Sequence, residues 1–356
     1  MSRFLSDKYS ALEAYTPGEQ PQDKKYIKLN TNESPYPPSP KVIEAVSEDE
    51  TRDLRLYSDP ESKKLKNAIA KRYGVTPDMV YVGNGSDEIL NFSFMAFFQC
   101  EKGLVFPDIS YGFYKVFGDL YGVNYTEAPL KDEFTVDIGD YISCGKNVVL
   151  ANPNAPTGMA LPLSQIEEIV KTNGDSLVLI DEAYVDFGGE SAVPLTKKYD
   201  NLLVVQTFSK SRSLAGARLG FGIGNKAIIE DLEKIKFSTN PYNVNRLTSA
   251  AGVAAMEDEE YFREKCLMIE KTREYTEKEL SRLGFNVLPS KTNFVFASHP
   301  DISGQRLYLE LKDMGILVRY FGKPRIKDYV RITIGTDQDM RALIGAAEQI
   351  LGKGGK

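Results

Sequence analysis

The chain has 356 residues, more than one ordinary hydrophobic core accommodates, and this length predicts two domains. Its hydrophobic fraction of 42%, charged fraction of 26% and formal net charge of −6 are typical of a soluble globular protein and argue against a nucleic-acid-binding surface. The three cysteines are widely separated and no apolar stretch has the length of a signal sequence or membrane span, so we expect a cytoplasmic protein with neither a zinc site nor a disulfide framework.

Residues 1–34 are polar, carry scattered aromatic side chains and predict an arm that docks on another part of the molecule. The closely spaced prolines that follow prevent a continuous helix directly after this arm. Pro40 is expected to open an amphipathic helix, KVIEAVSED, because proline is favoured in the first helical turn. Residues 54–60 predict an extended loop, and SKKLKNAIAKRYG predicts a helix that ends at Gly74.

A strand predicted at 80–82 runs into the glycine-rich sequence GNGSDEIL. We expect a strand-to-helix turn here, with Ser86 and Asp87 as the helix N-cap. The backbone N–H groups at such a turn, together with the helix dipole, favour a bound anion such as a phosphate. Glycine turns that open capped helices are common, so this signal alone does not assign a ligand.

Short β-rich runs alternate with helical stretches between residues 103 and 191. This alternation predicts an α/β fold with a mostly parallel sheet that is covered by helices on both faces. Asp181 follows the third of these strands, and the second strand is followed by NPNAPTG, in which two X-Pro bonds could be cis. The predicted strands are 104–106, 148–150 and 177–180, and the predicted helices are 111–120 and 164–171.

A buried strand predicted at 202–205 is followed by Ser209 and Lys210, with Arg218 further along the chain. Open α/β sheets bind ligands at the carboxyl ends of strands, where this lysine would lie. An amine, a hydroxyl and a guanidinium together suit a cofactor that has both an aldehyde and a phosphate, namely pyridoxal phosphate (PLP), bound through Lys210. Taken alone, a Ser-Lys pair after a strand is more often part of an ordinary loop.

The pattern changes after Asn240-Pro241 and indicates a smaller α+β unit. The only histidine, His299, lies in a predicted loop, which argues against hydrolase triads and multi-histidine metal sites. We therefore predict an arm at 1–34 that packs on the small domain or a partner subunit, a large domain at 35–240 and a small domain at 241–356. The small unit would contain helices at 246–256, 258–283 and 338–351 and strands at 284–289, 293–297, 316–318 and 330–334.

Five sequence motifs follow one another along the chain: GNGSDE, NPNAPTG, DEAY, SK with Arg218 after it, and VRITIG. In order and spacing they resemble the fold-type I PLP-dependent aminotransferases, and the resemblance covers essentially the whole chain. Within that family, AYTPG, LNTNESPYPP, RLYSDP and ILVRY are most similar to the histidinol-phosphate aminotransferases. The resemblance implies a large PLP-binding domain with a mostly parallel sheet and a smaller α+β domain. It also implies transamination of L-histidinol phosphate with 2-oxoglutarate, giving imidazole-acetol phosphate and L-glutamate, in histidine biosynthesis.

The resemblance also implies the groups that surround the cofactor ring. Lys210 would bind the PLP aldehyde and later move a proton at the reacting carbon, since a released lysine is a free amine beside it. Asp181 would keep the ring nitrogen protonated, because an ion pair at about 4 Å and an effective dielectric near 20 is worth roughly 4 kcal/mol. Tyr184 would donate to the ring's phenolate oxygen. We expect Asn154 to contact the same oxygen, with Asn152 as the alternative, because an alanine precedes Pro-Thr-Gly where many relatives have asparagine.

The remaining cofactor contacts would come from a stacking ring, the partner subunit and a phosphate cradle. Tyr111 would stack on the ring face, where some relatives use tryptophan, which this chain lacks. Tyr57 would reach the cofactor phosphate of the neighbouring subunit, so the active enzyme would be a homodimer with shared sites. A phosphate dianion needs several donors and at least one guanidinium. We expect these donors from Gly85, Ser86, Asp87, Ser209 and Arg218.

Substrate recognition would rest on two arginines and the arm. Related aminotransferases use an arginine at the position of Arg331 to bind an α-carboxylate, and a phosphate is also a target for bidentate hydrogen bonds. Arg319 would add a second cation for the phosphate of histidinol phosphate. Tyr15 and Asn32 would close over the imidazole side, although an arm that only ties subunits together is an alternative. No metal, nucleic acid or membrane partner is expected.

Other functions stay open at this stage. An aromatic or aspartate-type aminotransferase, or a threonine-phosphate decarboxylase, would use the same fold and an overlapping site. Arg319 favours a phosphorylated substrate, and the chain length and the arm favour a transaminase. A non-catalytic ligand sensor would need an appended DNA-binding domain, for which residues 1–34 are too short. A PLP-free phosphate-binding α/β protein would stay colourless after incubation with PLP.

Overall fold

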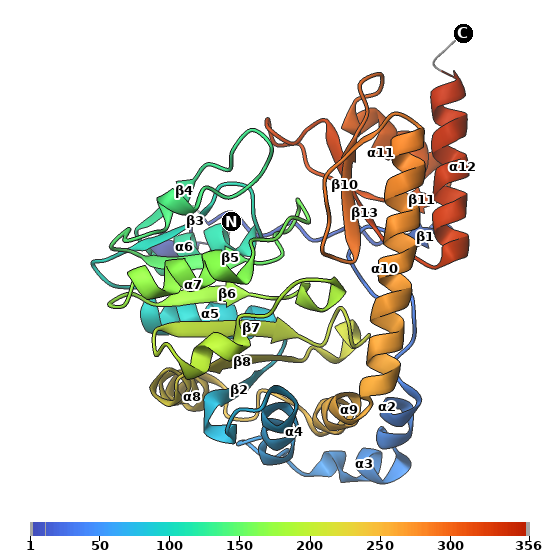
Figure 1. Ribbon diagram of the computed structural model, residues 1–356. Helices are drawn as coiled ribbons and strands as arrows, with labels where there is room; N and C mark the ends of the chain where they lie inside the picture. Colours follow the sequence, from blue (N-terminus) through green and yellow to red (C-terminus); the bar gives the residue numbers. More distant parts are fainter. Residues whose placement is uncertain (1–2, 11, 354–356) are drawn as a thin grey trace.

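The computed structural model describes residues 3–10 and 12–353. Within these residues, seven strands form a central sheet in the order β2-β8-β7-β6-β5-β3-β4 (Figure 1). Strand β8 is antiparallel to both neighbours and the other pairs are parallel, so the prediction of a mostly parallel sheet is confirmed. The strands are β2 (Val80–Gly83), β3 (Leu104–Pro107), β4 (Tyr125–Ala128), β5 (Asn147–Ala151), β6 (Val178–Asp181), β7 (Leu202–Thr207) and β8 (Gly220–Gly224).

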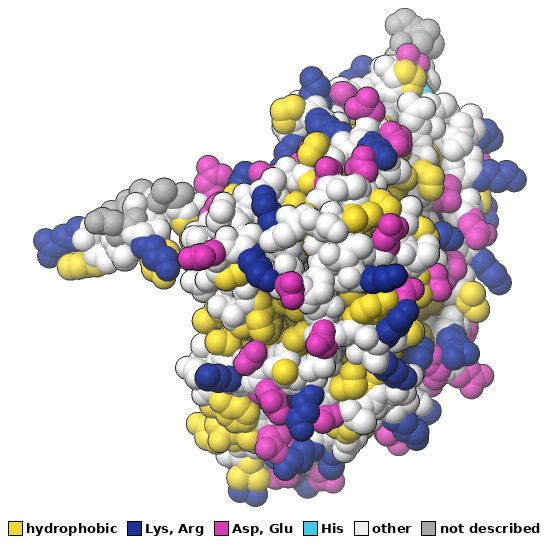
Figure 2. Space-filling model, turned by 60° about the vertical axis from the view of Figure 1, so that its left-hand side comes forward, with side chains coloured by type: hydrophobic (Ala, Val, Ile, Leu, Met, Phe, Trp, Pro, Cys, Tyr) yellow, Lys and Arg dark blue, Asp and Glu magenta, His cyan; other side chains and the backbone are white. Residues whose placement is uncertain are grey.

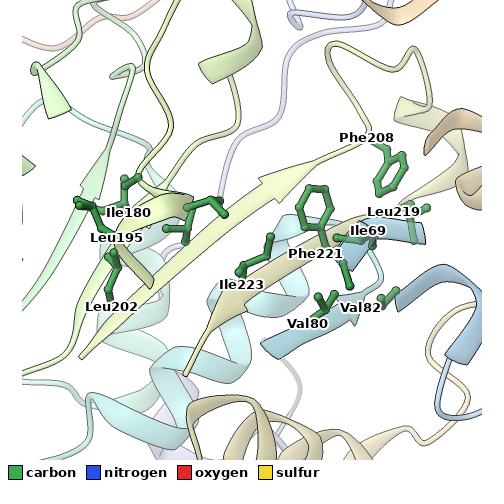
Figure 3. Packing of buried hydrophobic residues seen from close by; sticks show 14 of the residues in the cluster. Ile69, Val80, Val82, Ile180, Leu195, Leu202, Phe208, Leu219, Phe221 and Ile223 are labelled. Carbon is green, nitrogen blue, oxygen red and sulfur yellow. The ribbon is translucent and has the colours of Figure 1, made fainter. Parts of the chain in front are cut away.

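Helices cover both faces of this sheet, because alternate residues of each strand point to opposite sides. Val80 and Val82 belong to a core cluster with α4, α7 and α9, whereas Tyr81 belongs to one with α5, α6 and α8. Figure 3 shows part of the first cluster, where Phe221 and Ile223 of β8 lie beside their β2 partners. The helices of this unit are α2 (Pro40–Ala45), α3 (Glu48–Arg52), α4 (Lys63–Tyr73), α5 (Ser86–Phe97), α6 (Phe113–Tyr121), α7 (Leu163–Thr172), α8 (Lys226–Thr239) and α9 (Arg246–Glu257).

The C-terminal part of the chain forms a smaller unit with its own core cluster. In the described part of this unit, four antiparallel strands run in the order β12-β13-β10-β9, and α10, α11 and α12 pack against them (Figure 1). The elements are α10 (Glu259–Arg282), β9 (Asn286–Val287), β10 (Phe294–Ser298), α11 (Gly304–Asp313), β11 (Ile316–Leu317), β12 (Arg319–Tyr320), β13 (Tyr329–Thr333) and α12 (Asp337–Lys353).

The N-terminal arm contacts both units. It begins with the short helix α1 (Asp7–Ser10), and its strand β1 (Ile27–Lys28) pairs in parallel with β11. Leu29 belongs to the core cluster of the small unit. Tyr15 reaches the larger unit and stacks on Phe113, with ring centroids 4.3 Å apart. The arm therefore bridges the two units.

Helix α9 lies after the domain boundary predicted at residue 240, yet its buried side chains pack with the central sheet. Ala251, Ala254 and Ala255 belong to the same cluster as Val80. Among the residues after 240, the first that belongs to the core cluster of the small unit is Phe262 in α10. The division of the chain at residue 240 stays a prediction.

Two local predictions are wrong, and both errors concern caps. The helix expected from Pro40 through KVIEAVSED is broken after Ala45, because the Ser47 side chain accepts from Glu50 N–H at 3.3 Å and opens α3. Gly85, with φ of 78°, is the N-cap of α5 in place of Ser86 and Asp87, which are its first helical residues. Glycine adopts this φ without strain, and a Cβ at Gly85 would lie 2.7 Å from Nη2 of Arg218.

Several elements carry weak sequence signals and were not predicted, namely β4, β8, α8 and α11. Strand β8 has the sequence GFGIG, and glycine is depleted in strands. The glycine is required here, because a Cβ at Gly220 would lie 2.4 Å from the backbone nitrogen of Ser86. Both X-Pro bonds of NPNAPTG are cis, at Pro153 and Pro156.

The surface carries both signs of charge, and Figure 2 shows basic and acidic side chains interspersed over one face. None of the helices described here has the length and apolar character needed to cross a membrane. Within residues 3–10 and 12–353, no group of three or more His, Cys, Asp and Glu side chains could hold a metal ion.

Candidate active site

The carboxyl ends of the parallel strands meet at one edge of the central sheet, where a cavity of about 310 Å³ lies. Asp181 ends β6, and Ser209 and Lys210 follow the end of β7. Arg218 precedes β8, which runs in the opposite direction and therefore begins at the same edge. We call this space the strand-end cavity; Ser86 and the four residues named above all line it.

The Lys210 amine has the protonation behaviour expected of a nucleophile. Its Nζ donates to the backbone carbonyl of Thr31 at 3.2 Å and lies 5.8 Å from the centroid of the Tyr184 ring. The pKa of Lys210 is lowered to about 8, chiefly by burial and also by the charge of Arg331, while Glu33 opposes the shift. An amine with this pKa is partly unprotonated near neutral pH and can attack a carbonyl or accept a proton.

Asp181 provides a buried carboxylate at the far end of the same cavity. Its Oδ2 accepts from the Tyr114 hydroxyl at 2.8 Å, and its Oδ1 accepts from Ala183 N–H at 3.2 Å. Burial raises the pKa of Asp181 to about 6, and these two hydrogen bonds oppose the shift. The group is therefore mostly ionised at pH 7 and suited to a cationic partner. Tyr114 was not predicted, because in the sequence it is one more aromatic residue of an amphipathic helix.

The residues predicted to hold a phosphate gather at the N-terminus of α5. Ser86, Asp87, Ser209 and Arg218 line the strand-end cavity, and Gly85 precedes the helix. Backbone N–H groups of a first helical turn have no partners within the helix, so this end of the cavity suits an anion. The guanidinium of Arg218 adds the positive charge that a phosphate requires.

The Asp87 side chain has a different role from its backbone. Its carboxylate accepts from Arg218 Nη2 at 2.9 Å and from the Tyr111 hydroxyl at 2.8 Å. A carboxylate repels a phosphate, so Asp87 can contribute to an anion site only through its N–H. Its side chain holds the arginine and the tyrosine in place on either side.

Tyr184 and Asn32 meet although they are far apart in the sequence. Asn32 Nδ2 donates to the Tyr184 hydroxyl at 2.9 Å, which leaves the phenolic proton free to be donated elsewhere. Asn32 is itself fixed by Thr333, whose hydroxyl donates to Asn32 Oδ1 and accepts from Asn32 N–H, both at 3.0 Å. The arm, the segment that follows β6 and strand β13 thus converge at this hydroxyl.

Asn154 and Asn152 are both buried, and the polar atoms of their side chains are bonded within the protein. Asn154 donates to the Ile109 carbonyl and to Thr157, and its Oδ1 accepts from Ser110 at 2.8 Å. Asn152 is paired with the backbone of Leu161. Neither asparagine lines the strand-end cavity, which Ala155 lines instead. The predicted contact from Asn154 to the cofactor stays a prediction.

A second cavity of about 350 Å³ adjoins the first and shares Lys210 and Tyr184 with it. We call it the arm cavity, because Tyr15 and Asn32 of the arm line it together with Arg319 and Arg331 of the small unit. Its described lining includes Lys210, Lys323 and the two arginines but no Asp or Glu side chain. This balance of charge favours anionic ligands.

The two arginines of the arm cavity hydrogen-bond to backbone carbonyls. Arg319 donates to Thr16 O at 2.8 Å and to Pro17 O at 3.0 Å, and Arg331 donates to Asn30 O at 3.2 Å. All three carbonyls belong to the arm. Arg331 Nε is buried without a hydrogen-bond partner in the described part of the chain, which leaves one donor for a ligand.

Tyr57 lies away from both cavities of its own chain. Its side chain is 78% exposed and stacks on Tyr242, with ring centroids 4.3 Å apart. Leu54 and Leu56 on the same loop are also exposed. Apart from Gly85 and Asn154, the other predicted site residues all line at least one of the two cavities.

The family model described as aminotransferase class I and II matches residues 24–346. The chain belongs to the class I and II aminotransferase family. This aminotransferase is 54% identical to the histidinol-phosphate aminotransferase of Brachyspira hyodysenteriae, over 99% of each chain. It is also 54% identical to that of Marinomonas sp., over 98% of this chain and 100% of that protein.

A solved structure shows the same fold. The histidinol-phosphate aminotransferase of Sinorhizobium meliloti, in complex with pyridoxal-5'-phosphate, matches this aminotransferase with a TM-score of 0.89 at 24% identity, over 99% of each chain. The predictions of the fold class, of a PLP-dependent aminotransferase and of a close likeness to the histidinol-phosphate aminotransferases are confirmed.

Proposed function

We propose that the protein transfers the amino group of L-histidinol phosphate to 2-oxoglutarate, with PLP in the strand-end cavity and the substrate in the arm cavity. The observation that carries this proposal is Lys210, which lines both cavities. On one side of it lie a helix N-terminus with Arg218 and a buried carboxylate, which match the phosphate and the ring nitrogen of PLP. On the other side lies a cavity lined by cations, which matches a phosphorylated substrate.

The residues of the strand-end cavity have the chemistry that PLP requires. Ser86, Asp87 N–H, Ser209 and Arg218 would hold the phosphate, and glycine at positions 85 and 220 keeps the backbone and Arg218 close together there. Tyr111 would lie against the ring. PLP, when bound, supplies an electron sink that stabilises negative charge at the substrate carbon.

Three side chains would handle protons in this site. Lys210, with its lowered pKa, would accept the proton from the substrate carbon and deliver it to the cofactor carbon that carries the aldehyde in free PLP. Asp181 would keep the ring nitrogen protonated through an ion pair worth roughly 4 kcal/mol at about 4 Å. Tyr184 would donate its phenolic proton to the phenolate oxygen of the PLP ring. Asn32 already donates to the hydroxyl oxygen of Tyr184, so the hydroxyl proton is free for this bond.

Substrate orientation would depend on Arg319 and Arg331. A phosphate with a charge near −2 gains more from two guanidiniums than a single carboxylate does, which favours histidinol phosphate over aromatic amino acids. The same two arginines would hold the carboxylate groups of glutamate in the other half of the reaction. Tyr15 would cover the imidazole side.

We further propose a homodimer in which Tyr57 contacts the partner subunit's cofactor phosphate. Its exposed ring, beside exposed Leu54 and Leu56, supports a surface that is covered in the assembly. Mixing Lys210→Ala chains with Tyr57→Ala chains should form hybrid dimers with one intact site and restore activity that neither variant has at the same concentration. Absence of recovery in confirmed hybrids would rule out a shared site. A cytoplasmic location stays a prediction from the sequence.

The proposed reaction is tested by following products. Equimolar L-histidinol phosphate and 2-oxoglutarate should yield glutamate in proportion to the histidinol phosphate consumed, with loss of the signal in Lys210→Ala. Threonine phosphate serves as the control for the decarboxylase alternative, which would release CO₂ without forming glutamate. Glutamate formation with aspartate or phenylalanine at a higher kcat/KM than with histidinol phosphate would contradict the proposal.

A further inference from the structure

Arg319 and Arg331 form an unusual pair in the small sheet. They are direct partners in the register of β12 and β13, so their side chains leave the same face of an antiparallel pair. Like charges directly opposite each other on neighbouring strands destabilise a sheet. Accordingly, the charge of Arg319 contributes to lowering the pKa of Arg331, although burial is the larger cause.

The contacts of the two guanidiniums offset this repulsion without neutralising it. Besides the arm carbonyls, both guanidiniums lie over one aromatic ring, that of Phe321, and each Cζ is 5.5 Å from its centroid. Arg331 also lies over Phe294 at 5.2 Å. The negative face of an aromatic ring attracts a cation and leaves its N–H donors and its charge available to an anion.

Phe321 is anchored independently of the arginines. Its ring packs edge-on to Phe296, with centroids 6.5 Å apart, and belongs to a small hydrophobic cluster that includes Ile109 and Ile326. Both of these isoleucines also line the arm cavity. The ring is therefore held by packing contacts of its own beside the two arginines that line the cavity, so it can support both guanidiniums.

We propose that Phe321 is a positioning residue that holds Arg319 and Arg331 together as one site for a dianion, and that it thereby favours a phosphorylated substrate over a carboxylate. This inference rests on the proposed function, because it concerns the same substrate site. Without the ring, the two guanidiniums would repel each other, and binding would include the cost of bringing them together. With the ring, that cost is met in the folded enzyme before the substrate arrives.

The effect should appear mainly in binding. A phosphate engages both guanidiniums, whereas one carboxylate at this position carries half of the charge. Removing the ring should therefore raise KM for histidinol phosphate with little change in kcat, and raise KM for glutamate by a smaller factor. Loss of two ring contacts should weaken binding of a dianion by about tenfold.

The experiment measures the affinity of the PLP-loaded enzyme for inorganic phosphate by calorimetry. In the loaded enzyme the cofactor's own phosphate fills the strand-end site, so the titrated phosphate reports the arm cavity. Phe321→Leu should bind phosphate about tenfold more weakly than wild type, whereas Phe321→Tyr, which keeps the ring, should stay within about twofold. Phe321→Met, similar in volume, replaces the leucine variant if that variant does not fold. Phe237→Leu, at an exposed phenylalanine outside the lining of both cavities, is the control.

The outcomes separate this inference from the proposed function. Unchanged phosphate affinity in Phe321→Leu, or equal losses in Phe321→Leu and Phe321→Tyr, would overturn the role of the ring. If the role of the ring is overturned but Arg319→Ala still weakens phosphate binding, the proposed substrate site stands. If neither Arg319→Ala nor Arg331→Ala alters phosphate affinity, the substrate site itself is misplaced and the inference falls with it.

Discussion

The two cavities that meet at Lys210 differ in how their charges are balanced. In the strand-end cavity each acid has protein partners: Asp87 is paired with Arg218, Glu33 is paired with Lys28, and Asp181 accepts from Tyr114. The described lining of the arm cavity contains no acidic side chain, and two of its cations lie directly opposite each other. The first cavity is thus organised by the protein alone, whereas the second carries positive charge that only a ligand can neutralise.

The two cavities are also formed by different parts of the chain. The strand-end cavity is built from residues at the ends of strands in one sheet, where ligands of open α/β sheets bind. The arm cavity lies where three parts of the chain meet: the arm, the small unit at β12 and β13, and loops of the larger unit that include residues 109–112 and 155–156. The pairing of β1 with β11 holds the arm against the small unit. Changes in the first should therefore affect the chemical step, and changes in the second should affect the choice of substrate.

The largest effect is expected for Lys210→Ala. Removing the amine shared by both cavities should lower kcat by several orders of magnitude while PLP still binds, because the phosphate cradle and Asp181 are intact. The measurement pairs steady-state transamination with PLP retention, and the exposed Lys115→Ala is the control. Turnover close to wild type would contradict a role for Lys210 in proton transfer.

Asp181→Asn should reduce kcat by about a thousandfold, which corresponds to the roughly 4 kcal/mol of the ion pair with the ring nitrogen. The amide has the shape of the carboxylate but only one acceptor oxygen, so it can accept from Tyr114 or from Ala183 but not from both, and the loss of one hydrogen bond should leave the fold intact. Tyr114→Phe is the matched variant, since it removes a hydrogen bond to Asp181 but leaves the charge. Equal losses in the two variants would mean that positioning, rather than charge, is the contribution of Asp181.

Arg319→Ala should affect the choice of substrate more than the chemistry. Loss of a charge-assisted contact should lower kcat/KM for histidinol phosphate by about tenfold to a hundredfold and for glutamate by less. Lys323→Ala, which removes another cation of the same cavity, shows how much of the effect is due to general charge. Equal losses for both substrates would remove the distinction between the two cavities.

The last prediction concerns the free energy of unfolding rather than activity. Glu182 is buried beside Asp181, accepts from Ser191, Ala192 N–H and Gln206, and has a pKa raised to about 7, chiefly by burial. Between the unfolded pKa of 4.5 and about 7, the folded chain keeps a proton that the unfolded chain has lost. The free energy of unfolding should therefore fall as pH rises through this window, by about 3 kcal/mol.

Glu182→Gln should remove the part of this fall that Glu182 contributes and leave the part due to Asp181, whose pKa is also raised by burial. Urea unfolding of the PLP-free protein at several pH values between 4.5 and 8 measures it, with the exposed Glu190→Gln as the control. A parallel pH dependence in wild type and Glu182→Gln would show that Glu182 does not keep its proton in the folded state.

The difference between the cavities also explains what the sequence could predict. Asp181 and Lys210 were found because each follows a strand with a recognisable apolar run, and the edge of a parallel sheet brings such residues together. Arg218 was found from its position in the motif that begins at Ser209 and Lys210, not from its own strand. Tyr114 and Phe321 were not found, since their roles depend on a partner from another element: Asp181 in one case and two arginines in the other. Nothing in the local sequence of either aromatic residue distinguishes it from a core side chain.

The caps and the glycine strand were missed for a related reason. Gly85 and Gly220 owe their positions to the close approach of Arg218 and Ser86, which only the folded structure shows. The pairing of Asn32 with Tyr184 could not be derived either, because it depends on the path of the arm.

The central claim is that histidinol phosphate is the preferred amino donor, and the half-reaction tests it most directly. The PLP-loaded enzyme is mixed separately with histidinol phosphate, phenylalanine, aspartate and threonine phosphate, and the cofactor spectrum is followed without an amino acceptor. We expect histidinol phosphate to convert the cofactor with the highest ratio of rate to half-saturating concentration. Faster conversion by aspartate or phenylalanine, or a spectrum unchanged by histidinol phosphate, would contradict the account.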